Sequence, residues 1–84
     1  MRQSYTDRGV IHYIAGRYDQ AIADYDQALR LSLGHAHTYY NRASAYRAKG
    51  QTTEAIADYR KVLSLDPTVT QAKTKLQELG VSQP

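Results

Sequence analysis

Three histidines are the residues of this chain best suited to bind a metal or to transfer a proton. They are His12, His35 and His37, and the chain contains no cysteine that could join them as a ligand. His35 and His37 are two positions apart, a spacing that does not put both side chains on one face of a helix. Because a metal site needs three or four converging ligands with a supporting shell, the sequence predicts no metal site.

Aspartates are the second group of residues that could act as acids or bases. Asp24, Asp26 and Asp58 lie in segments with helical periodicity, where a charged face is more often simply solvated. The chain contains no glycine-rich phosphate loop, no nucleophile elbow and no His-Glu zinc motif. We therefore expect no catalytic residues, no cofactor and no enzymatic activity.

Two arginines each precede an aspartate by the same interval of sixteen residues. These pairs are Arg8 with Asp24 and Arg42 with Asp58. We hypothesise that each pair forms a partly buried ion pair inside its half of the chain. The alternative is that the arginine side chains extend to water and leave the aspartates free, because many ion pairs are incidental.

A period of 34 residues organises the whole chain. Residues 2–33 and 36–67 are identical at ten positions when they are offset by 34, and the block Ala-Ile-Ala-Asp-Tyr at 21–25 recurs at 55–59. A fixed period of this size marks a helical repeat protein, which stacks similar units and presents a surface for binding. The question about function is therefore what the chain binds.

Length and composition limit the remaining classes of function. The chain has 84 residues, enough for one small domain, and a net charge of +3 whose basic residues are spread along the sequence. Nothing indicates a nucleic-acid footprint, a membrane-spanning stretch or a signal peptide. The cytoplasm is the simplest compartment, unless the chain is part of a longer protein.

Apolar and aromatic residues recur at steps of three and four, which predicts an all-α fold of about five helices over 3–15, 19–31, 36–48, 53–65 and 68–79. Gly16 and Gly50 fall where a turn with positive φ is expected. Asp19 and Thr53 are plausible N-caps of the second and fourth helices. Asp66-Pro67 stops the fourth helix and can open the fifth. Short connections make successive helices antiparallel neighbours.

The pattern resembles the tetratricopeptide repeat, which implies an antiparallel helix-hairpin solenoid. A single domain over 1–84 would contain repeat one at 2–35, repeat two at 36–69, a capping helix at 68–79 and a frayed tail at 80–84. The landmarks of repeat two are Tyr39, Arg42-Ala43, Tyr46, Gly50, Ala55, Tyr59, Val62 and Pro67. Those of repeat one are Tyr5, Arg8-Gly9, Gly16, Tyr18, Ala21, Tyr25 and Ala28.

The resemblance also implies a concave face, lined by the first helix of each repeat and by the capping helix, where peptides dock. Asn41 could bond both polar groups of a backbone amide, and Arg47 and Lys75 could hold a carboxylate. Tyr13 and Tyr40 could also contribute to binding, and the alternative is that these two side chains merely cover neighbouring helices. The predicted peptide-binding residues are Val10, Tyr13, His37, Tyr40, Asn41, Ser44, Arg47 and Lys75.

One subgroup of the family clamps the terminal carboxylate of chaperone tails with five residues, namely two lysines, two asparagines and a further basic residue. Asn41 and Lys75 match that set, whereas Thr6, Val10 and Gln71 stand at the other three positions. The resemblance therefore does not imply a complete clamp of this kind.

Three functions are open on the sequence alone. The first is a protein-interaction module that binds a peptide of a partner, for which Tyr40→Ala with Asn41→Ala is expected to abolish binding without unfolding. The second is self-assembly into a homo-oligomer, in which domain exchange could occur because Ser32-Leu33-Gly34 replaces the usual Asp-Pro stop between the repeats and would permit a more continuous helix. The third is a structural fragment of a longer array or scaffold.

Overall fold

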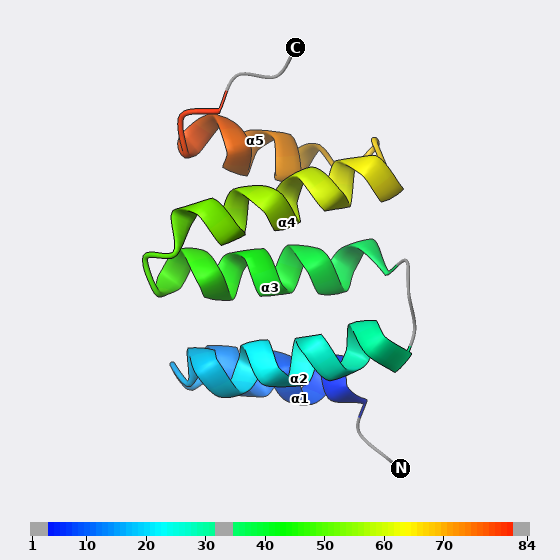
Figure 1. Ribbon diagram of the computed structural model, residues 1–84, viewed down its shortest axis with the longest axis vertical. Helices are drawn as coiled ribbons and strands as arrows, with labels where there is room; N and C mark the ends of the chain where they lie inside the picture. The colour runs from blue at the N-terminus through cyan, green and yellow to red at the C-terminus, as the bar shows by residue number, and fades with distance from the viewer. Residues whose placement is uncertain (1–3, 32–34, 82–84) are drawn as a thin grey trace.

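The computed structural model describes residues 4–31 and 35–81, and these residues form five α-helices (Figure 1). The helices are α1 (Tyr5–Ile14), α2 (Tyr18–Leu31), α3 (Ala36–Ala48), α4 (Thr52–Leu65) and α5 (Thr70–Glu78). No strand occurs within the described ranges. The all-α prediction is confirmed.

The helices stack as two antiparallel hairpins followed by a single helix. Figure 1 shows α3, α4 and α5 lying one above another along the long axis, with the α1–α2 hairpin at the other end. Helix α3 packs against α2 on one side and against α4 on the other, so it joins the two repeats. The domain measures 42 × 24 × 17 Å, the elongated shape of a short solenoid.

Equivalent glycines make the tight turn within each hairpin. Gly16 has φ of 79° and Gly50 has φ of 81°, which a residue with a side chain rarely adopts. The same hydrogen bonds close both turns: the amide of Arg17 donates to His12 O at 2.8 Å, and that of Gln51 donates to Tyr46 O at 2.9 Å. The predicted role of the two glycines is confirmed.

Several helix ends differ from the sequence prediction. Helices α2 and α4 begin one residue early, so Asp19 and Thr53 lie inside the first turn and neither is an N-cap. Asp19 instead pairs with Lys49 at the end of α3. Asp66 ends α4 as predicted, but α5 begins only at Thr70, so Pro67 lies in the connecting turn rather than in α5.

Two further predictions concern the connections and the tail. The segment Ser32-Leu33-Gly34, on which the domain-exchange hypothesis rests, lies outside the described residues. At the C-terminal end, Gly80 has φ of 83° and the amide of Val81 donates to Leu76 O at 2.9 Å. These two residues therefore close the end of α5 and are not frayed, while 82–84 are also outside the described residues.

Two apolar clusters form the core. The smaller joins repeat one to α3 through Ala21, Ile22, Tyr25 and Ala45. The larger lies between α3, α4 and α5 and consists of Ala43, Ala55, Tyr59, Val62, Ala72 and Leu76. Alanine supplies half of the residues of each cluster, which lets the helices approach one another closely, and α5 covers the apolar side of α4.

Candidate functional site

The two arginine–aspartate pairs predicted from the sequence are both formed. Arg8 donates from Nε and Nη2 to Asp24 at 2.9 and 2.8 Å, and Arg42 donates from Nε and Nη2 to Asp58 at 2.8 Å each. Both aspartates are buried, while the Arg8 side chain is 53% exposed and that of Arg42 is 21% exposed. The bidentate geometry is the strong form of this interaction and fixes the first helix of each repeat on the second.

Arg42 also forms a bond that the sequence analysis missed. Its Nη1 donates to Asp26 Oδ1 at 2.7 Å, so one guanidinium holds an aspartate of its own repeat and another from the repeat before. The hydrogen bond with Asp58 raises the pKa of Arg42, and burial opposes this only in part. Because Asp26 is not part of the recurring block at 21–25, the internal repeat carried no signal for this link.

The first of the three hollows that the predicted binding residues line lies where α1 approaches α3. Thr6 and Thr38 share a hydrogen bond of 3.2 Å between their hydroxyl oxygens, which ties the two helices together. Three of the predicted binding residues, Val10, His37 and Asn41, line this hollow. It therefore combines an apolar side chain, an imidazole and an amide on the faces of two first helices.

The second hollow has a basic rim formed by α3 and α5. Arg47 donates from Nη1 to Glu78 Oε1 at 2.9 Å, and Lys75 Nζ lies 3.6 Å from the same oxygen. The hydrogen bond from Arg47 lowers the pKa of Glu78 below its usual value. Two cations thus share one anion, beside a wall that includes Tyr13 and Ser44.

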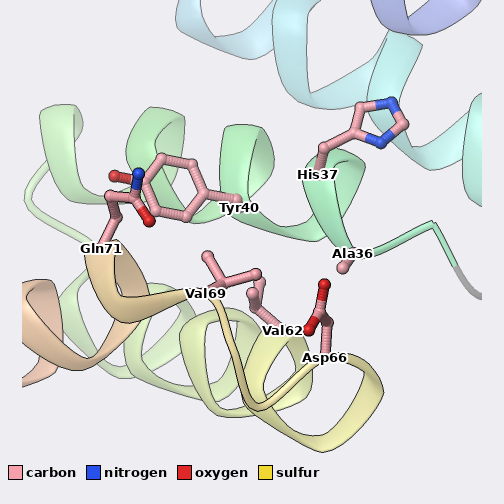
Figure 2. A pocket seen from close by; sticks show the side chains of 7 residues that line it. All are labelled: Ala36, His37, Tyr40, Val62, Asp66, Val69 and Gln71. Atoms are coloured by element: carbon pink, nitrogen blue, oxygen red, sulfur yellow. The ribbon is translucent and has the colours of Figure 1, made fainter.

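The third hollow, of about 560 Å³, lies between the start of α3 and the connection from α4 to α5 (Figure 2). Its lining residues are Ala36, His37, Tyr40, Val62, Asp66, Val69 and Gln71. In Figure 2 the His37 ring points away from Val62 and Val69, toward the first repeat. His37 also lines the first hollow, so these two hollows share a wall.

Tyr40 takes part in core packing as well as in the third hollow. Its ring packs edge-on against the buried Tyr59, with 5.5 Å between ring centroids and 70° between ring planes. Burial raises the pKa of Tyr40. The Tyr40→Ala half of the double variant expected to abolish binding without unfolding would therefore also disturb the core of repeat two.

All eight residues predicted from the sequence line one or another of these hollows. Whether they bind a ligand stays a prediction. The sequence analysis missed the contribution of the α4–α5 connection, from which Asp66 and Val69 line the third hollow. The Asp66-Pro67 stop signal located this connection but not the direction in which its side chains point.

A metal site and a membrane-spanning helix are two other features that the described residues could have formed. Over 4–31 and 35–81, no group of three histidine, aspartate or glutamate side chains is placed to hold a metal ion. Across the same part of the chain, every helix is too short or too polar to cross a membrane.

Comparison with known families agrees with the paired helices and the 34-residue period. The sequence profile described as Tetratricopeptide repeat matches residues 6–69. The chain belongs to the tetratricopeptide repeat family. Repeats of this family form interaction surfaces, so the tetratricopeptide fold of this chain supports protein binding.

Curated relatives and a solved structure extend this finding. The chain is 33% identical over 75 residues to human sperm-associated antigen 1, covering 89% of this chain and 8% of that protein. It is 37% identical over 59 residues to the Hsp70-Hsp90 organizing protein of Triticum aestivum, covering 70% of this chain and 10% of that one. The tetratricopeptide chain thus spans about a tenth of the length of these relatives.

A solved tetratricopeptide domain has the same arrangement of helices. It is described as the first TPR of Spaghetti (RPAP3) bound to the HSP90 peptide SRMEEVD. It superimposes with a TM-score of 0.87 at 26% sequence identity, covering 90% of this chain and 60% of that one. The predicted antiparallel solenoid is therefore confirmed by a tetratricopeptide structure.

Proposed function

We propose that this chain binds a peptide segment of a partner protein along the face formed by α1, α3 and α5. The observation that carries the proposal is the series of three hollows on these helices, in a fold shared with a domain solved with a bound peptide. Asn41 offers an amide that can donate to and accept from a peptide backbone. The hollows on either side of it would take side chains.

The charges on this face favour a peptide that contains an acidic side chain. Arg47 and Lys75 are each about one-third exposed, and among the described residues Glu78 is the one carboxylate that pairs with them. A second carboxylate from a peptide would balance the remaining positive charge and would accept hydrogen bonds from Arg47 or Lys75. Tyr13 lies in the same hollow and would cover the apolar part of the acidic side chain.

In this proposal the free C-terminal carboxylate of the peptide contributes little to affinity. Thr6, Val10 and Gln71 occupy three of the five positions of the chaperone-tail clamp and supply no cation. Without those cations a terminal carboxylate would gain little over a side-chain carboxylate. The preferred ligand is therefore an internal acidic segment, or a terminal segment whose free carboxylate is dispensable.

Fluorescence anisotropy with two labelled peptides tests the proposal. Both have the sequence SRMEEVD, one with a free C-terminal carboxylate and one with a C-terminal amide. We expect both to bind with similar affinity, and a peptide with glutamines in place of its two glutamates to bind more weakly. Arg47→Ala should weaken binding of the acidic peptides, while Arg60→Ala on the exposed side of α4 serves as the matched control.

Three results would contradict the proposal. One is the absence of saturable binding by any acidic peptide, and another is equal binding of the glutamate and glutamine peptides. The third is a loss of affinity in Arg60→Ala that matches the loss in Arg47→Ala. A large preference for the free carboxylate would overturn only the statement about the terminus.

Self-assembly is the second candidate, because large apolar side chains are exposed. Ile14 is 78% exposed and Leu31 is 73% exposed, and these two residues lie at opposite ends of the α1–α2 hairpin. A homo-oligomer that covers them would show a molar mass in light scattering that rises with concentration. A mass of one chain throughout would exclude it. A cytoplasmic location also stays a prediction.

A further inference from the structure

The third hollow combines an acidic group with apolar walls. Val62 is fully buried and lines the hollow together with Val69 and Tyr40. The carboxylate of Asp66 lines the same hollow, and in Figure 2 it is directed from the end of α4 toward Ala36 at the start of α3. With a volume of about 560 Å³, the hollow offers one negative charge beside an apolar surface and has room for a long side chain.

Asp66 is held by hydrogen bonds but has no cationic partner among the described residues. Its Oδ1 accepts from the amide of Thr68 at 3.1 Å and from the hydroxyl of the same residue at 2.5 Å. The hydroxyl bond lowers the pKa of Asp66, which favours the ionised carboxylate. Within 4–31 and 35–81, no lysine, arginine or histidine pairs with Asp66, and Oδ2 makes no hydrogen bond. This second oxygen is therefore available to a ligand.

The other polar residues that line the hollow do not balance the charge of Asp66. The imidazole of His37 points toward the first repeat in Figure 2, away from the α4–α5 connection, and Gln71 carries no charge. Repeat one has Ser32 at the position equivalent to Asp66, so the carboxylate is a feature of repeat two alone. The third hollow is thus acidic, whereas the rim of the second hollow is basic.

We propose that the third hollow binds the side chain of a lysine or arginine of the partner peptide. This inference rests on the proposed peptide binding and adds a second charge requirement to it. The carbon stem of the basic side chain would lie against Val62, Val69 and Tyr40, and its cationic group would donate a hydrogen bond to Asp66 Oδ2. An apolar side chain in the same place would desolvate the carboxylate without giving it a partner, which costs free energy.

The positions of the acidic and basic hollows limit the spacing of charges in the ligand. From Ala36, beside the acidic hollow, to Arg47, on the basic rim, α3 rises by about 16 Å. An extended peptide advances about 3.3 Å per residue, so its basic and acidic residues would lie about three to five positions apart. The peptide SRMEEVD fits this spacing, because its arginine precedes its second glutamate by three positions and its aspartate by five.

Fluorescence anisotropy with the full chain and a pair of labelled peptides tests the inference. One peptide is SRMEEVD, and in the other citrulline replaces arginine, which removes the charge and keeps the shape. A second pair, with the same residues in reverse order, covers the opposite direction of the peptide. The chain is used as wild type and as Asp66→Asn, which keeps an acceptor for Thr68. Glu54→Gln is the matched control, because Glu54 is exposed at the start of α4 and lines none of the three hollows.

We expect the arginine peptide of at least one pair to bind about fivefold more tightly than its citrulline counterpart. Asp66→Asn should remove this preference, and Glu54→Gln should keep it. Arg47→Ala should weaken both peptides of the pair and also keep the preference, because it acts on the acidic residue of the ligand. Urea unfolding verifies that each variant is folded.

Two kinds of failure are distinguishable. Saturable binding with equal affinity for arginine and citrulline in both pairs overturns this inference and leaves the proposed peptide binding intact. A preference for arginine that persists in Asp66→Asn has the same consequence. The absence of saturable binding by every peptide overturns the proposed function, and this inference with it.

Discussion

Arg42 and Asp58 are joined by two parallel hydrogen bonds of 2.8 Å, and the same guanidinium reaches back across the repeat boundary to Asp26. One side chain therefore fixes α3 on α4 and also fixes repeat two on repeat one. Within residues 4–31 and 35–81, Arg8 makes only the first kind of contact, which gives a matched comparison within one molecule.

Arg42→Ala should lower the free energy of unfolding by about 3 kcal/mol, because it leaves the buried carboxylate of Asp58 without its partner. Arg8→Ala should cost less, since the Arg8 side chain is more than half exposed and bonds a single aspartate. Urea unfolding followed by circular dichroism measures both. Equal losses in the two variants would mean that neither the link to Asp26 nor the deeper burial of Arg42 adds to stability.

Gly9 is required by a close approach, because a Cβ at this position would lie 2.5 Å from Tyr25 Cε1. Tyr25 is buried, so its ring cannot move aside freely. In Gly9→Ala, overpacking should cost about 1–3 kcal/mol, whereas the higher helix propensity of alanine should contribute about 1 kcal/mol. Because the cost is the larger of the two, we expect the substitution to lower the thermal midpoint of unfolding. In a Tyr25→Leu background, Gly9→Ala should raise the thermal midpoint. A rise of the midpoint in the wild-type background would disprove the close approach.

Variants of Tyr40 and Asn41 distinguish an effect on the fold from an effect on the proposed peptide binding. Tyr40→Ala removes the edge-on contact with Tyr59 and should cost about 2 kcal/mol of stability. Tyr40→Phe keeps the ring and should keep the fold. Asn41→Ala should leave urea unfolding unchanged and weaken binding of an acidic peptide by anisotropy. Unchanged affinity in Asn41→Ala would remove this residue from the proposed site.

Tyr25 makes stability depend on pH in the alkaline range. Burial raises the pKa of Tyr25 from 10.0 to about 12, so the folded state binds the phenol proton more tightly than the unfolded state does. The resulting stability is complete below pH 10 and is lost as the pH rises from about 10 to about 12.

Urea midpoints of wild type and Tyr25→Phe at pH 7, 10 and 11 measure this effect. We expect the variant to lose less stability than wild type between pH 10 and pH 11. The difference between the two proteins at pH 7, where the hydroxyl is protonated in both states, is the control for the lost hydroxyl. Parallel curves over the whole range would show that Tyr25 does not titrate with unfolding.

The sequence was sufficient to predict most of the fold. The 34-residue period placed five helices, and Gly16 and Gly50 marked the two hairpin turns because only glycine adopts their φ at little cost. Helix starts were harder to predict: Asp19 has the chemistry of an N-cap, yet it lies inside α2 and pairs with Lys49. A side chain that can cap a helix can also form an ion pair. Which of the two contacts it forms depends on the charged groups that the tertiary structure brings near it.

The sequence by itself determined the repeat, the helices and the Arg8–Asp24 and Arg42–Asp58 pairs, because a fixed interval in two antiparallel helices brings the same positions together in each repeat. Only the tertiary structure decided that Arg42 also holds Asp26, that Tyr59 buries one side of Tyr40, and that Arg47 and Lys75 share Glu78. These contacts join helices from different units or different faces of one unit. Their geometry depends on how the helices cross and on side-chain rotamers, neither of which a period along the chain specifies.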